Sequence, residues 1–136
     1  MDAVLAVMPA LFGLLIGAGL QYLLGRAAES RQQLTLHRTQ SYIDYFRALA
    51  STGHTGRTKE TLGAATDAKV RICIYGSGAV VKRLHRFETI GATVNSPQAK
   101  IAVTELIQEM RRDAGTNLSK IDNSDFLPIL FGPEKL

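Results

Sequence analysis

The feature that most constrains this chain of 136 residues is an uncharged stretch near its start, from Ala3 to Gly25. Gln21 is the only strongly polar side chain within it. A helix of about 23 residues rises roughly 34 Å, whereas the hydrocarbon core of a bilayer is about 30 Å thick. The stretch therefore predicts a single transmembrane helix, with residues 1–25 as the anchor.

A cleaved signal peptide is the first alternative to a retained anchor. Signal peptides begin with positive charge and then carry only about 7–15 apolar residues. This chain begins Met1-Asp2, and its apolar run is longer than that. Both differences favour retention of the helix as an anchor.

The charges on either side of the stretch predict its orientation. The N-terminal side has Asp2 and no basic residue, whereas Arg26, Arg31 and Arg38 follow on the C-terminal side. Basic residues favour the cytoplasmic side of a membrane helix. We therefore expect a single-pass protein of the inner (cell) membrane, with its N-terminus outside, its C-terminal domain in the cytoplasm and these three arginines at the membrane surface, where each is worth about 1 kcal/mol.

Small residues recur along one face of the same stretch. Small side chains at such spacing let two helix backbones approach closely, which predicts self-association into a homo-oligomer. Because glycine and alanine are common in membrane helices, the stripe could equally have no such role. The predicted self-association face consists of Ala6, Ala10, Gly13 and Gly17.

The chain after the anchor begins with a long helical segment. No Gly or Pro occurs from residue 26 to residue 50, so we expect the helix to continue as a juxtamembrane stalk over 26–52. The segment 51–56 contains two glycines and ends it. The second half of the stalk carries an apolar stripe at helical spacing, made of Tyr42, Tyr45, Phe46 and Leu49.

Residues 57–115 are predicted to form three further helices, which close a bundle with the C-terminal half of the stalk. They begin near Thr58, at Gly78 and at Pro97, where Ser96 is the expected N-cap. The last of them is expected to bury Ile101, Ala102, Leu106 and Met110.

The segment from Val70 to Tyr75 is ambiguous between helix and strand, because apolar and other residues alternate in it. As a strand before Gly76-Ser77-Gly78, it would open a dinucleotide-binding unit and favour a nucleotide-sensing or enzymatic domain. The third glycine of that motif would fall at position 81, which is Val81. A break between two helices, with Gly76 as C-cap and Ser77 as N-cap, is therefore favoured.

Two groups of residues are candidate contacts for a protein partner. The helix from Gly78 has a basic face, which is either simply solvated or contacts lipid headgroups or an acidic partner. The C-terminal tail, 116–136, contains a short apolar run that either docks on the bundle or binds a partner. The residues concerned are Lys82, Arg83 and Arg86 on the helix, and Phe126, Leu127 and Phe131 in the tail.

Composition limits the remaining function classes. The 16 Lys and Arg exceed the 12 Asp and Glu only modestly, and there is no Trp, so we expect no specific nucleic-acid partner. The single cysteine, Cys73, excludes an internal disulfide. No His-Glu-x-x-His, paired-cysteine or P-loop motif occurs, so we expect no catalytic, cofactor or metal site, no small-molecule substrate and no enzyme activity.

Short motifs along the chain resemble those of small, uncharacterised bacterial single-pass membrane proteins with a helical cytoplasmic domain. Such proteins place an Arg-x-x-Glu-x-Arg stalk, an aromatic patch, a Tyr-Gly-Ser turn and a Met-Arg-x-Asp helix end after a membrane helix. The resemblance implies the architecture and no activity. The matching residues are Arg26, Glu29 and Arg31, then Tyr42, Tyr45 and Phe46, then Tyr75 to Val81, then Met110 to Asp113.

Together these patterns predict an all-α protein: a transmembrane helix, a stalk and a small three- to four-helix cytoplasmic bundle. Its expected function is that of a non-catalytic interaction or scaffold protein, which holds itself or an unidentified protein partner at the lipid bilayer. An alternative is a small oligomerising effector that disrupts the bilayer.

Overall fold

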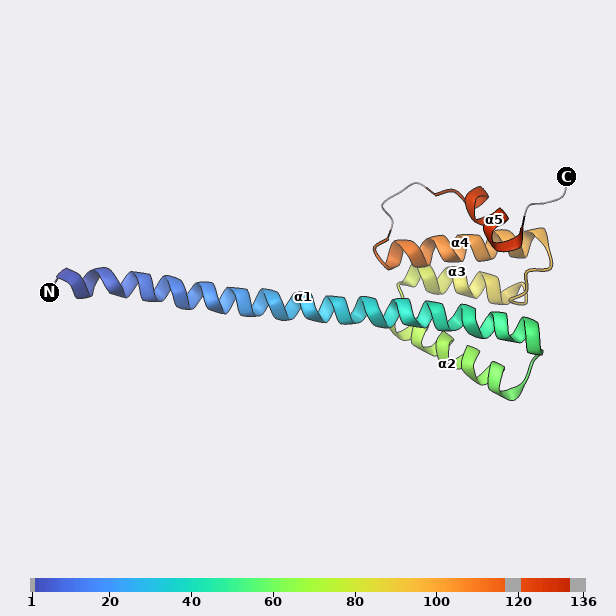
Figure 1. Cartoon of the computed structure of the whole chain (residues 1–136), viewed down its shortest axis with the longest axis horizontal. Helices are drawn as coiled ribbons and strands as arrows, with labels where there is room; N and C mark the ends of the chain where they lie inside the picture. Colours follow the sequence, from blue (N-terminus) through green and yellow to red (C-terminus); the bar gives the residue numbers. More distant parts are fainter. Residues whose placement is uncertain (1, 117–120, 133–136) are drawn as a thin grey trace. The chain divides into compact units, whose positions relative to one another are not determined.

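The computed structural model describes residues 2–116 and 121–132, and the side chains of these residues except 2–15 and 123. The described residues form α-helices and contain no strand (Figure 1). The helices are α1 (Asp2–Thr55), α2 (Lys59–Tyr75), α3 (Gly78–Thr89), α4 (Pro97–Asp113) and α5 (Asn123–Phe131).

The chain divides into two compact units, Met1–Thr35 and Leu36–Leu136. Unit 1 is the first part of α1, and every side chain described between Ile16 and Leu34 is exposed. Unit 2 contains the rest of α1 and the other four helices. The all-α helical bundle predicted from the sequence is confirmed in unit 2.

The predicted transmembrane helix over Ala3–Gly25 is corrected by the structure. Among the described residues, none of the helices combines the length and apolar character that crossing a membrane requires. The single-pass inner-membrane location is corrected with it. The bilayer-disrupting effector and the membrane-surface role of Arg26, Arg31 and Arg38 depended on this helix and are not carried further.

The core of unit 2 lies between α1, α2, α3 and α4. Tyr45, Ile72, Phe87 and Leu106 are its largest fully buried side chains, each at most 1% exposed. Full burial of such a side chain contributes about 1.5–3 kcal/mol. The predicted stripe of the stalk is confirmed, with Phe46 and Leu49 partly buried against the core. The complete cluster is Tyr42, Tyr45, Ala68, Ile72, Val80, Leu84, Phe87, Ala102, Val103, Leu106 and Met110.

The turn between α2 and α3 has the predicted caps. Residues 70–75 are the last turns of α2, so the strand required by the dinucleotide-binding alternative is not formed. The Ser77 hydroxyl accepts a hydrogen bond from the Val80 backbone N–H at 3.3 Å. A Cβ atom on Gly76 would lie 2.7 Å from the Ile72 carbonyl oxygen, so only glycine fits this close approach. Ser96 likewise caps α4 through the Ala99 N–H at 3.2 Å, with Pro97 as the first helical residue.

A polar cluster joins α1 to the ends of α2 and α4. The Asp113 carboxylate accepts hydrogen bonds from the Tyr42 hydroxyl and from the Ser77 backbone N–H at 3.2 Å. Arg38 lies 3.4 Å from the same carboxylate, and its Nε donates to the Tyr75 carbonyl oxygen at 2.6 Å. Burial and the Asp113 carboxylate together raise the pKa of Tyr42 above its ordinary value. Arg38 therefore contributes to the stability of unit 2 through contacts within that unit.

A second polar link joins α1, α2 and α3. The Tyr45 hydroxyl donates to Glu88 Oε1 at 2.7 Å, and Lys69 Nζ lies 3.2 Å from Glu88 Oε2. Burial, and next the hydrogen bond to Glu88, raise the pKa of Tyr45. The otherwise apolar position of Tyr45 in the core thus has its one polar atom satisfied.

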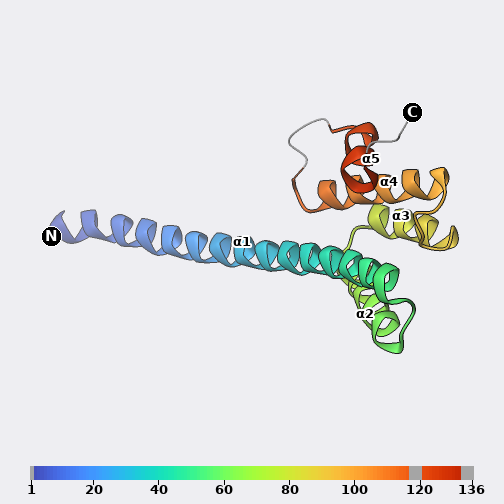
Figure 2. The ribbon, with the colours of Figure 1, turned by 45° about the vertical axis from the view of Figure 1, so that its right-hand side comes forward.

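Helix α5 lies beside α4 in both views of the chain (Figure 1 and Figure 2). Phe131 packs against the core, with Lys100 Nζ 5.3 Å from the centre of its ring. Arg111 lies 5.9 Å from the centre of the Phe126 ring, a cation–π arrangement. Of the two alternatives for the tail, its helix therefore docks on the bundle.

Candidate functional site: a groove between α3 and α4

Helices α3 and α4 form a hairpin that presents one face to the core and another to solvent. Val80, Leu84 and Phe87 of α3 are buried, whereas His85, Arg86 and Thr89 on the other side of the helix are exposed. The connecting loop turns at Gly91, which has φ +100°, and at Ala92, whose N–H donates to the Phe87 carbonyl oxygen at 3.1 Å. The loop fixes the separation of the two helices and so the groove between them.

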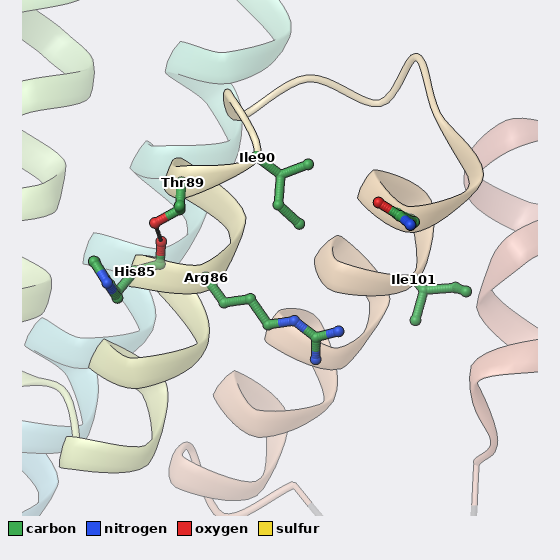
Figure 3. Close-up of a pocket in the computed structure, with 6 residues that line it drawn as sticks. His85, Arg86, Thr89, Ile90 and Ile101 are labelled. Carbon is green, nitrogen blue, oxygen red and sulfur yellow. Dashed lines mark hydrogen bonds between the residues drawn. The ribbon is translucent and has the colours of Figure 1, made fainter.

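The groove contains an open hollow of about 550 Å³ (Figure 3). Ile90 and Ile101 form its apolar walls, and they remain 37% and 43% exposed. Figure 3 shows Arg86 extending from α3 toward α4. The lining residues are His85, Arg86, Thr89 and Ile90 of α3, and Gln98 and Ile101 of α4.

One side of the groove is positively charged. Arg83 and Arg86 each donate from Nη1 to the same atom, Glu105 Oε2, at 2.8 and 2.7 Å. One carboxylate neutralises only one of these two charges. Lys82 is exposed on the same helix and makes no ion pair with any described residue. The groove edge therefore keeps a net positive charge.

The polar groups of the hollow differ in what they can offer to a ligand. The Thr89 hydroxyl donates to the His85 backbone carbonyl oxygen at 2.8 Å, as Figure 3 shows, so its proton is already used within the helix. Guanidinium groups bind carboxylates through paired hydrogen bonds. The arrangement can therefore hold a carboxylate beside an apolar side chain.

A second candidate surface lies on α1 in unit 1. Five large apolar side chains among the first nine with described side chains are more than half exposed. Within the described part of unit 1 no second element packs against them, because these residues form a single helix. These residues are Ile16, Leu20, Tyr22, Leu23 and Leu24.

The structure places the predicted self-association residues only in part. The side chains of Ala6, Ala10 and Gly13 lie outside the described residues. Gly17 is described and exposed, and a Cβ atom there would meet nothing within 4 Å. In the same unit Arg26 and Arg31 are exposed, so two of the three predicted basic residues remain accessible.

The predicted partner contacts fall into two groups. Arg86 lines the groove and Arg83 meets it at Glu105, whereas Lys82 is exposed on the same helix. The tail residues are partly buried against unit 2 and are not brought to the groove edge by any described contact. These tail residues are Phe126, Leu127 and Phe131.

The contribution of α4 to the groove is not evident from the sequence pattern. The pattern predicts a buried Ile101, whereas Ala99, Ala102, Val103 and Leu106 fill the buried face. Ile101 lies about 100° around the helix from Ala102, at the margin of that face. The sequence does contain a signal for this position: Ile101 is an additional apolar residue next to a stripe that is already complete without it.

No family model, curated protein or solved structure matches this chain in the comparisons made.

Proposed function

We propose that the chain is a non-catalytic helical scaffold protein that assembles with a second copy of itself through α1 of unit 1. The observation that carries this proposal is the exposure of apolar side chains along α1 from Ile16 onward. Monomeric proteins rarely leave a contiguous apolar surface of more than a few hundred Å² uncovered, and a larger one marks an interaction site.

The spacing of the exposed residues favours a helix as the covering element. Along one face they follow one another at intervals of four, three, four, three and four residues, the alternation of a heptad repeat. Two helices with this repeat can keep the same face in contact by winding around each other. A second copy supplies such a helix. The residues of this seam are Ile16, Leu20, Leu23, Ala27, Ser30 and Leu34.

The residues off the seam are consistent with this role. Glu29 and Gln32 lie on the opposite side of the helix and are exposed, as does the exposed Tyr22. An apolar stripe with a mostly polar opposite side is the pattern of a helix that packs on one side only. Small side chains at Ala27 and Ser30 leave room for a large side chain of the facing helix.

Sedimentation velocity on the full chain, over a range of protein concentrations, tests the proposal. We expect the wild type to sediment as a dimer or larger assembly. The double substitution Leu20→Gln and Leu23→Gln places an amide at two seam positions in each copy. It should weaken association by at least about tenfold, because each buried amide without a partner costs about 1–3 kcal/mol.

Leu36→Gln is the matched control, since Leu36 is 62% exposed but belongs to unit 2. It should leave the sedimentation profile unchanged. A wild type that remains monomeric at every concentration contradicts the proposal, and so does an equal effect of Leu36→Gln.

A further inference from the structure

We propose that the groove between α3 and α4 is a docking site for an acidic, amphipathic segment of a partner protein. This inference goes beyond self-assembly, because it uses a different surface, in unit 2, and a different partner. The occupant is identified by two properties of the groove, its charge and its apolar walls.

Charge complementarity requires an acidic occupant. The side chains of Arg83 and Arg86 are 41% and 54% exposed, and they share the carboxylate of Glu105. None of the described residues that line the hollow is acidic. A partner carboxylate at this edge would therefore neutralise a charge that the described part of the chain leaves uncompensated.

The arginines are also held in position before a partner arrives. Each guanidinium has five N–H donors, and the ion pair with Glu105 uses one terminal nitrogen of each. The remaining donors can form a paired hydrogen bond with an incoming carboxylate. Since Glu105 already orders both side chains, binding loses less side-chain entropy than it would with free arginines.

The apolar walls favour a protein segment over a nucleic acid. Ile90 and Ile101 face an open hollow, and covering them removes apolar surface from water. A phosphate backbone cannot supply that contact. A segment with acidic residues beside a large apolar residue supplies both contacts at once.

Binding of labelled synthetic peptides to the full chain, measured by fluorescence anisotropy, tests the inference. The first peptide is a helical sequence with Glu and Leu on one face. The second replaces each Glu by Gln, and the third replaces each Leu by Ser. We expect the first peptide to bind at least about tenfold more tightly than either of the others, and its affinity to fall as salt is added.

Variants of the chain locate the binding site. Arg83→Gln with Arg86→Gln should reduce the affinity for the first peptide by at least about tenfold. Ile101→Ser should reduce it by several fold. Arg47→Gln is the matched control, because Arg47 is an exposed arginine of α1 that pairs with Asp44, and it should have no effect. Circular dichroism and the midpoint of urea unfolding confirm that each variant is folded.

Three results would overturn the inference: equal binding of the Glu and Gln peptides, unchanged binding by the arginine double variant, or tighter binding of a single-stranded oligonucleotide. The Leu20→Gln and Leu23→Gln variant separates this inference from self-assembly. It should still bind the first peptide in full. If it does not, the binding site lies in the assembly and the groove is excluded.

Discussion

Unit 1 and the core of unit 2 are both built from α-helices with apolar side chains, yet these side chains are exposed in unit 1 and buried in the core of unit 2. Leu20 and Leu23 of unit 1 are 54% and 66% exposed, whereas Phe87 and Leu106 of unit 2 are fully buried. In unit 2 the breaks around residues 56, 76 and 91 return the chain on itself, so that each apolar face meets another. Unit 1 has no such break. A helix covers its apolar face only where the chain, or another molecule, supplies a second element.

The largest expected effect tests this comparison directly. Phe87→Ala should lower the free energy of unfolding of unit 2 by about 3–5 kcal/mol, because it removes a fully buried ring and leaves a cavity. Leu20→Ala and Leu23→Ala should change it by less than about 0.5 kcal/mol, since both side chains are more than half exposed. Urea unfolding of the full chain, followed by tyrosine fluorescence, measures both. Similar losses in the two units would break the comparison.

A smaller effect concerns the polar cluster at the end of α4. Asp113→Ala should destabilise unit 2 by about 1–3 kcal/mol, because it leaves Arg38, the Ser77 N–H and the buried Tyr42 hydroxyl without their shared acceptor. Urea unfolding again provides the measurement.

Asp122→Ala is the matched control for Asp113→Ala. Asp122 is an exposed aspartate whose role is local to the start of α5. Its replacement should cost about 1 kcal/mol or less. A loss with Asp122→Ala as large as that with Asp113→Ala would show that the cluster does not specially stabilise unit 2.

Much of unit 2 could be predicted from the sequence because its signals are local. Ser96-Pro97 specifies the start of α4, and Gly76-Ser77 separates α2 from α3 through contacts with residues nearby in the chain. The alternation of apolar and other residues around Ile72 is also typical of a strand. The segment is helical in the structure, where Ile72 of α2 packs in the core with residues of the neighbouring helices.

The groove could not be predicted in the same way. Arg83 and Arg86 were candidates from their charge, but their shared acceptor, Glu105, is about 20 residues away on another helix. Whether a basic residue is paired depends on how two helices pack, which helical periodicity does not specify. Ile101 illustrates the same limit, because a residue at the edge of an apolar stripe is buried only if a neighbouring helix reaches it.

The smallest predicted effect concerns the stability of unit 2 at alkaline pH, and it depends on the Tyr45 hydroxyl. Its pKa is raised in the folded state, so above about pH 10, the value for an exposed tyrosine, the unfolded chain releases a proton that the folded chain retains. Stability from this group is complete below that pH and is lost as pH rises further. Tyr45→Phe should cost about 1 kcal/mol at pH 7, and the difference from the wild type should shrink above about pH 10. Unfolding midpoints in urea at several pH values measure it. Tyr22→Phe, in the exposed segment of unit 1, should leave the profile unchanged, and a constant difference for Tyr45→Phe across the range would contradict the role of burial.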